Sequence, residues 1–285
     1  MSNNHLKALI ITSLGVLLMS LESLFIKLTS ISSLTFAFYV GIFMFVSLNS
    51  FLFIQHKHKI LTVYQGNLKV MLFTAFLFGT SNIFFISAIK TTTVANVVLI
   101  LAAAPIFASI FAYLFYKEKS GKNIYIASFF IFIGLLFIVG SQIGSGDFLG
   151  NIYALVCASF FSCAFVILSK HPKLNRFSIA AIAGVFSMIG SSLFVQSLQI
   201  DISTLLILLL MGMFISPVSR VLMGIGTKTL PGSEVSLLMI IETVMAPIWV
   251  WIFLKEVPAS NTFIGGAIIL VTLLINSVYL LKRKH

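Results

Sequence analysis

Residues 94–118 read VANVVLILAAAPIFASIFAYLFYKE, and residues 232–256 read GSEVSLLMIIETVMAPIWVWIFLKE. Each stretch is mostly apolar, is long enough to cross a bilayer once, and ends in Lys-Glu. The two stretches lie 138 residues apart (232 minus 94), and the same shift aligns residues outside them without a gap. The aligned pairs include Ser81 with Ser219, Lys90-Thr91 with Lys228-Thr229, and Asn123 with Asn261. The chain therefore contains an internal repeat.

The composition is that of an integral membrane protein. Of 285 residues, 59% are hydrophobic and 9% are charged, and the mean hydropathy is +1.12. Ten spans of about 20 residues would leave roughly 85 residues for loops and tails, so a soluble enzyme or a DNA-binding domain does not fit. The two cysteines, Cys157 and Cys163, lie in one apolar run and point to different helix faces. We therefore expect no disulfide framework, no metal and no cofactor.

Ten apolar stretches follow one another along the chain. They run from 8 to 29, 34 to 54, 68 to 89, 94 to 116, 123 to 141, 150 to 170, 176 to 197, 203 to 225, 233 to 254 and 261 to 281. Every connection is short, so neighbouring spans are expected to be antiparallel. Of the 18 basic residues, Lys27, Lys90 and Lys255 fall on one side, Arg220 falls inside a span, and the other 14 fall on the opposite side. The positive-inside rule then places both termini in the cytoplasm, and topology rather than nucleic-acid binding explains the net charge of +11.

Five spans per repeat is an odd number, so the second repeat enters the membrane from the opposite side. The predicted fold is an all-α membrane protein with ten transmembrane helices, arranged as two inverted five-helix repeats over residues 1–145 and 146–285. The first spans of the two repeats align more loosely, with Lys27 opposite Lys170 at a shift of 143 (170 minus 27). Inverted repeats are typical of secondary transporters, whose solute site lies near the bilayer midplane. A duplication relic in a structural protein is the alternative.

At these motifs the chain resembles the drug/metabolite transporter superfamily, in particular its ten-span EamA-type members. The resemblance covers nearly the whole chain and rests on VANVV (94–98), APIF (104–107), LPGSEV (230–235), ETVMAPIW (242–249), the two Lys-Glu pairs and Gly265-Gly266. Many relatives have Pro directly after the acid of the ninth span, where this chain has Thr243. We therefore expect the kink one turn later, at Pro247, and we regard Pro105 in the fourth span as a further structural candidate.

The resemblance implies a basket of eight helices around a central cavity. It also implies that the fifth and tenth helices are peripheral and often lie at a dimer contact, so a monomer and a homodimer both remain open. Glu118 and Glu256 end their spans, and the repeat together with the resemblance favours a structural role at helix ends. Family members move small metabolites or amphiphilic compounds, and the resemblance does not name a solute.

Three ionisable side chains lie deep within predicted spans: Glu22, Arg220 and Glu242. Such residues are costly in a bilayer and are candidates for function. At about 1.5 Å per residue, Arg220 lies about 9 Å and Glu242 about 13 Å from the cytoplasmic ends of spans eight and nine. Because a short loop joins these two spans, we expect an ion pair between Arg220 and Glu242.

Glu22 has no base at comparable depth, because Lys27 is expected to face away and to reach the outer surface. Three roles remain open for this carboxyl group. It could couple transport to protons or another cation, contact an amine of the solute, or accept hydrogen bonds from hydroxyl groups such as those of Ser20 or Thr29.

Further candidates come from the repeat and from helix periodicity. The shift of 138 sets Asn82 opposite Arg220, next to the matched Ser81 and Ser219, either as solute or gate contacts or as packing residues. Trp249 lies two turns from Glu242 on nearly the same helix face, where its ring could meet a cation. Asn96 either caps the fourth span or faces the cavity.

The predicted function is secondary transport of a small solute by alternating access, with proton coupling left open. With all three deep charges ionised, the cavity carries a net charge of minus one, which favours amino-acid-like, amine or nucleoside-like solutes over dianions. The alternative functions are a passive channel, an intramembrane enzyme and a subunit without flux. The enzyme is disfavoured because all five histidines fall in loops or tails. The expected partners are the solute, protons and membrane lipid, with no nucleic acid. A bacterial inner membrane fits the compact architecture, as an organelle membrane also would.

Overall fold

The structure is a computed structural model that describes residues 3–119, 121–140, 147–226, 230 and 232–284. The first half contains α1 (Asn3–Ser20), α2 (Glu22–Lys27), α3 (Ser33–His56), the 3-10 helix η1 (Lys57–Tyr64), α4 (Leu68–Thr91), α5 (Val94–Leu101), α6 (Ala104–Tyr116) and α7 (Lys122–Gly140). The second half contains α8 (Phe148–Lys170), α9 (Arg176–Ser192), α10 (Ile202–Leu209), the π-helix η2 (Leu210–Ile215), α11 (Ser216–Gly226), α12 (Gly232–Leu254) and α13 (Ser260–Lys284).

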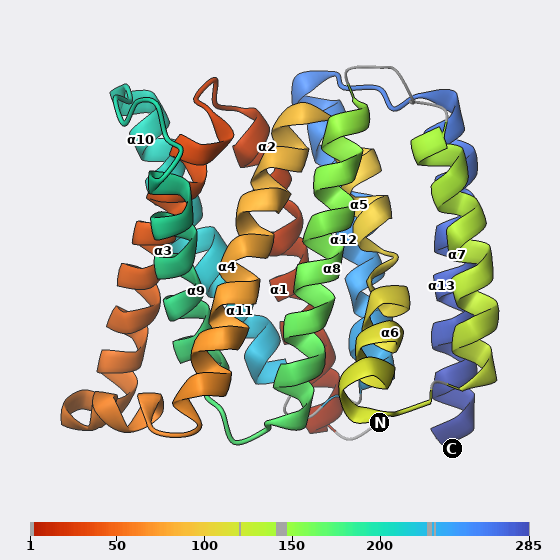
Figure 1. Cartoon of the computed structure of the whole chain (residues 1–285), viewed down its shortest axis with the longest axis horizontal. Coiled ribbons are helices and arrows are strands. Elements are labelled where there is room, and N and C mark those ends of the chain that lie inside the picture. The colour runs from red at the N-terminus through yellow and green to blue at the C-terminus, as the bar shows by residue number, and fades with distance from the viewer. Residues whose placement is uncertain (1–2, 120, 141–146, 227–229, 231, 285) are drawn as a thin grey trace.

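The prediction of an all-helical membrane fold is confirmed for the residues that the structure describes. Seven helical rods are long and apolar enough to cross a membrane, and Arg176–Ser192, Leu238–Leu254 and Ser260–Asn276 are shorter apolar helices. The rods run roughly parallel to one another along the bundle (Figure 1). The arrangement as ten spans in two inverted repeats stays a prediction.

Local sequence signals begin several of these helices. The side chains of Ser32, Asn67, Thr93, Asn175 and Asp201 each accept a hydrogen bond from a backbone N–H in the first turn of the following helix. Such capping satisfies donors that have no partner within the helix. The polar residues between the apolar stretches therefore end one rod and start the next.

Two glycine contacts join the halves. A Cβ atom on Gly41 of α3 would lie 2.5 Å from the Gly184 carbonyl oxygen of α9, and one on Gly184 would lie 2.6 Å from the Gly41 oxygen. Gly134 of α7 and Gly265 of α13 show the same reciprocity, at 2.8 Å and 2.5 Å. Only glycine permits such close backbone approach between membrane helices. Each contact pairs a helix of the first half with a helix of the second.

Helices α7 and α13 stand together at one side of the bundle (Figure 1). A groove of about 690 Å³ runs between them and is lined mainly by apolar side chains such as Phe130, Val271 and Ile275. This peripheral position agrees with what the family resemblance implies for the fifth and tenth spans. A dimer contact at this face stays a prediction.

Helix α1 lies next to the two helices that carry Arg220 and Glu242. It packs against both α11 and α12, while α8 packs against α4, α5 and α6. The helix of the predicted first span is irregular at one residue, Leu21, which lies between α1 and α2 and whose N–H bonds to the carbonyl oxygen of Leu18, three residues earlier. The deep carboxylate of the first span therefore lies directly after this irregular residue.

Candidate functional site

The deep arginine pairs with a different carboxylate from the one expected. Arg220 Nη1 lies 3.0 Å from Glu22 Oε1 and also donates to the Ser216 carbonyl oxygen at 3.0 Å. The Glu22 side chain is 7% exposed and that of Arg220 is 29% exposed. The expected ion pair of Arg220 with Glu242 is therefore wrong, as is the expectation that Glu22 has no base nearby. The reason is the packing: α1 and α2 bring Glu22 to α11, although spans eight and nine are neighbours in sequence.

Glu242 nevertheless belongs to the same cluster. It lies close enough to interact electrostatically with both Glu22 and Arg220. We call Glu22, Arg220 and Glu242 the charged trio. Its members come from α2, α11 and α12, and its formal charge is minus one when all three groups are ionised. A proton or a cationic group of a solute can balance that surplus charge.

Trp249 of α12 contacts the last turn of α1. Its Nε1 atom donates to Ser20 Oγ at 3.0 Å, and Ser20 Oγ donates to the Leu17 carbonyl oxygen at 2.7 Å. The indole is thus fixed against the last turn of α1, directly before Leu21 and Glu22. This contact orients the ring of Trp249, which is half-buried.

The two matched serines and Asn82 have partners of their own. Ser219 is fully buried and donates to the Ser216 carbonyl oxygen within α11 at 2.9 Å. Asn82 Nδ2 donates to Ser187 Oγ of α9 at 3.3 Å. Ser81 Oγ lies 4.0 Å from Cys157 Sγ of α8. The structure therefore does not place Asn82 against the charged trio, although the repeat sets it opposite Arg220.

Cys157 is a residue that sequence reasoning missed. Its thiol is buried and contacts the Ser81 hydroxyl group, which joins α8 to α4. The sequence shows only a cysteine within an apolar run, and neither spacing nor periodicity could have indicated this position.

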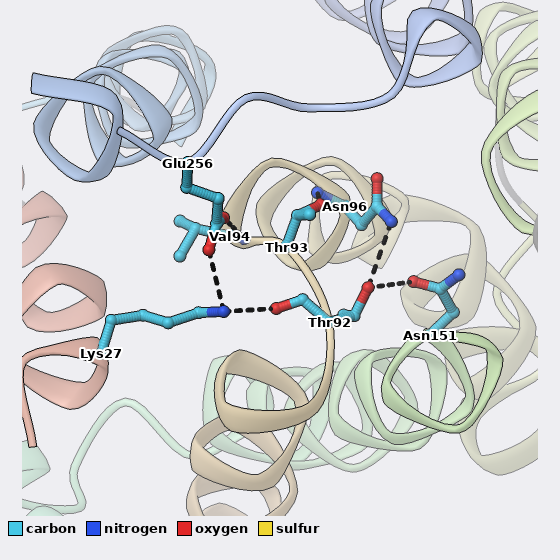
Figure 2. Close-up of polar contacts among 7 residues, drawn as sticks. All are labelled: Lys27, Thr92, Thr93, Val94, Asn96, Asn151 and Glu256. Carbon is cyan, nitrogen blue, oxygen red and sulfur yellow. Dashed lines mark hydrogen bonds and ion pairs between the residues drawn. The ribbon is translucent and has the colours of Figure 1, made fainter. Parts of the chain in front are cut away.

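A second polar cluster lies at the end of the bundle where α2 and α12 finish (Figure 2). Lys27 Nζ lies 2.9 Å from Glu256 Oε2 and donates to the Thr92 carbonyl oxygen at 2.9 Å. Glu256 Oε1 accepts a hydrogen bond from the Val94 backbone N–H, at the start of α5, at 2.7 Å. Lys27 was expected to face away from Glu22 and to reach the outer surface. The structure pairs it with Glu256 and the α4–α5 connection rather than with Glu22.

Asn96 neither caps α5 nor stands free in a cavity. Thr93 caps the helix, while the fully buried Asn96 donates from Nδ2 to Thr92 Oγ1 at 3.2 Å. Its Oδ1 atom accepts from Thr262 Oγ1 at 2.7 Å, and Thr92 Oγ1 in turn lies 3.4 Å from Asn151 Oδ1 (Figure 2). Asn96 therefore ties α5 to α13.

The remaining structural candidates lie at helix ends and at a helix interior. Pro105 occupies the first turn of α6, where its missing N–H costs nothing, whereas Pro247 lies inside α12. Glu118 follows Lys117, the C-terminal cap of α6, and pairs with Lys170 at the end of α8. Glu234, in the first turn of α12, pairs with His5 at 3.1 Å.

The fold and the charged trio define an α-helical membrane protein with ionisable groups deep in its bundle. A family model described as the EamA-like transporter family matches residues 6–140 and 148–278, and the chain belongs to that family. A solved structure titled "Crystal structure of protein" has the same fold, with a TM-score of 0.66 and 17% identity, covering 95% of this chain and 97% of that one.

Curated relatives carry transporter names. The chain is 25% identical to the uncharacterized transporter YdfC of Bacillus subtilis (strain 168) over 63% of its own length. It is 24% identical to an uncharacterized transporter of Archaeoglobus fulgidus over 66% of its length, and 25% identical to the uncharacterized transporter sll1164 of Synechocystis over 69%. In each comparison the chain spans 61% of the relative's length.

Proposed function

We propose that this chain is a secondary transporter that moves a small cationic or zwitterionic solute by alternating access. The observation that carries the proposal is the charged trio of an EamA-like family member, in which Arg220 pairs with Glu22 and Glu242 interacts electrostatically with both. Amino-acid-like, amine and nucleoside-like solutes have the charge that this centre would attract.

The contacts of the trio favour one carboxylate over the other for binding solute or a proton. Arg220 engages Glu22 directly, so that pair is the fixed part of the trio. Glu242 interacts electrostatically with both partners from a third helix, and among the described residues it forms no ion pair of its own. We therefore assign solute or proton binding to Glu242, with Trp249 as the adjacent aromatic surface and Glu22 as the group that positions Arg220.

Two features support alternating access between inverted halves, residues 1–145 and 146–285. The reciprocal glycine contacts of α3 with α9 and of α7 with α13 pair equivalent helices of the two halves. In addition, α1 packs on α11 as α8 packs on α4, which is the pattern that a two-fold axis in the membrane plane would produce. The charge distribution favours both termini in the cytoplasm, and a bacterial inner membrane is the proposed location.

The first test is a thermal-unfolding screen of the detergent-purified chain against amino acids, polyamines and nucleosides. A ligand that binds only the folded state raises the midpoint temperature by mass action. We expect a hit that Glu242→Gln removes and that Glu234→Gln, which changes another acid on the same helix, leaves in place. A hit that survives Glu242→Gln would contradict the assigned binding role.

The second test uses proteoliposomes loaded with the hit compound. A carrier shows saturable uptake and counterflow, whereas a channel shows neither. If protons are coupled, an imposed pH gradient drives uptake by the unmodified chain but not by Glu242→Gln. Flux without saturation or counterflow would replace the carrier proposal by the channel alternative.

A further inference from the structure

We propose that Lys27–Glu256 and Lys170–Glu118 are two equivalent latches, one at each membrane face, which the transport cycle opens in turn. The inference rests on the proposed alternating access and names the groups that close each face. Both ion pairs are formed in this structure.

The repeat makes the four residues equivalent in pairs. Glu118 falls on Glu256 at the shift of 138, and Lys27 falls opposite Lys170 at the shift of 143. The repeat by itself shows only that similar residues recur. The structure adds that each lysine binds the glutamate of the other half, Lys27 with Glu256 and Lys170 with Glu118. Each latch therefore bridges the two halves.

The backbone beside each glutamate has the same unusual conformation. Lys117 and Lys255, which directly precede Glu118 and Glu256, have φ values of 55° and 58°, in the left-handed region. Lysine adopts this conformation far less readily than glycine does. In both halves this residue ends a helix, with its N–H bonded to the carbonyl oxygen four residues earlier. The same local geometry thus presents the two carboxylates.

The outer latch joins three elements. Glu256 binds Lys27 of α2 with one carboxylate oxygen and the Val94 N–H of α5 with the other, while Lys27 also donates to the Thr92 carbonyl oxygen (Figure 2). Both side chains are about one-fifth exposed, at 21% and 20%. This carboxylate therefore holds α2, the α4–α5 connection and the end of α12 together.

The inner latch lies at the opposite end of the bundle, where α6 and α8 finish (Figure 1). Lys170 pairs with Glu118 and also lies over the ring of Tyr116, 5.7 Å from its centroid. The side chains of Lys170 and Glu118 are 35% and 51% exposed, so water competes for this pair more than for the outer one. The outer latch is therefore the tighter of the two.

A latch and a static support respond differently when their ion pair is broken. If the halves rock about the centre of the membrane, opening one face closes the other, so weakening one latch must favour one side at the expense of the other. A static support would lose stability without any preference for a side. Side-specific chemical access to the centre of the bundle separates the two roles.

The experiment places one reporter cysteine near the charged trio. Met245→Cys, half-buried and one turn from Glu242 on α12, is introduced into full-length protein in which Cys157→Ala and Cys163→Ala remove the native thiols. A membrane-impermeant thiol reagent is then added to right-side-out or inside-out vesicles. The measured quantity is the ratio of the two modification rates.

The latch variants are Glu256→Gln and Glu118→Gln, because glutamine keeps the size and the acceptor oxygen but removes the charge. We expect Glu256→Gln and Glu118→Gln to shift the rate ratio by about fivefold in opposite directions, the effect of losing one partly exposed ion pair. Lys27→Gln should copy Glu256→Gln, and Lys170→Gln should copy Glu118→Gln. Asp201→Asn, whose contacts lie within the start of α10, is the matched control and should leave the ratio unchanged.

Gel filtration and thermal unfolding confirm that each variant is folded before labelling. Shifts in the same direction, or no shift in any of the four variants, would overturn the latch proposal even if the proteoliposomes transport solute. Opposite shifts in a protein that moves no solute would instead retain the latches and refute the transport function. The two proposals can therefore fail separately.

Discussion

The third and fourth helical rods of the two halves are built differently, although their sequences align. These rods are α4 and α5–α6 in the first half, and α10–η2–α11 and α12 in the second. In the first half, α4 is continuous, whereas the fourth rod is broken between α5 and α6. In the second half, α12 is continuous, whereas the third rod contains the π-helix η2 between α10 and α11. Irregular backbone deep in a membrane bundle is tolerated where protein or water satisfies it, and it often marks functional positions.

The charged trio follows the same asymmetry. Arg220 and Glu242 come from the second half, and the first half contributes only Glu22, directly after the irregular residue Leu21. Asn82, the counterpart of Arg220, instead bonds to Ser187. An internal repeat can therefore set the scaffold while the polar centre departs from its symmetry.

The largest change in stability is expected at Arg220, whose counterpart in the first half is the uncharged Asn82. Arg220→Met should lower the free energy of unfolding by about 3 kcal/mol, because it leaves the Glu22 carboxylate buried without its partner. Asn82→Ala, at the equivalent position, should cost about 1 kcal/mol, since it removes one neutral hydrogen bond. Thermal or denaturant unfolding in detergent measures both, and equal losses would contradict the comparison.

A double variant sharpens this prediction. Glu22→Leu combined with Arg220→Met removes both charges, so most of the stability lost in Arg220→Met should return. Solute binding should not return, because the trio would no longer exist. Continued loss of stability in the double variant would show that Glu22 is not the group left without a partner.

The next effect tests the symmetric part of the scaffold. Gly41→Ala and Gly184→Ala should each destabilise the fold by about 2 kcal/mol, because the new Cβ meets a backbone oxygen that cannot move aside easily. Gly140→Ala is the control, since a Cβ there meets nothing within 4 Å. Unfolding measurements should give similar losses for the first two variants and almost none for the control.

A smaller effect distinguishes the two prolines. Pro247→Ala should raise the free energy of unfolding by about 1 kcal/mol, because it restores an N–H donor inside α12. Pro105→Ala should lower it slightly, since proline suits the first turn of α6. Changes of the same sign in thermal unfolding would refute this distinction. Slower flux by Pro247→Ala would indicate that Pro247 contributes to movement.

The smallest effect is a difference between the starts of α10 and α4 in how their stability responds to acid. Hydrogen bonds from Ser203 and Thr204 hold the pKa of Asp201 below its ordinary value. Stabilisation by this carboxylate is therefore present above the unfolded pKa and is lost as the pH falls through the lowered value. The amides at the start of α10 should exchange faster with solvent on acidification, whereas those of α4, capped by the neutral Asn67, should not. Asp201→Asn should abolish the difference.

Sequence patterns predicted the membrane class and the apolar helices, whereas the depth of Glu22, Arg220 and Glu242 in the membrane stays a prediction. These features follow from local physical chemistry: apolar length sets a span, and the rise per residue sets depth. The same patterns did not reveal the irregularity at Leu21 or the break between α5 and α6. Helix breaks depend on packing between rods, which hydropathy does not report.

The ion-pair partners of the charged residues show most clearly what sequence patterns could not predict. Proximity in sequence favoured Arg220 with Glu242, yet α1 packs against both α11 and α12 and brings Glu22 to the arginine. Likewise, the repeat matched Glu118 with Glu256 and Lys27 with Lys170, but it did not show that each lysine crosses to the glutamate of the other half. The sequence alone determined which groups are charged and where along each helix they lie, because both are properties of one helix. Only the tertiary structure decided which groups meet, because that depends on how the helices pack against one another.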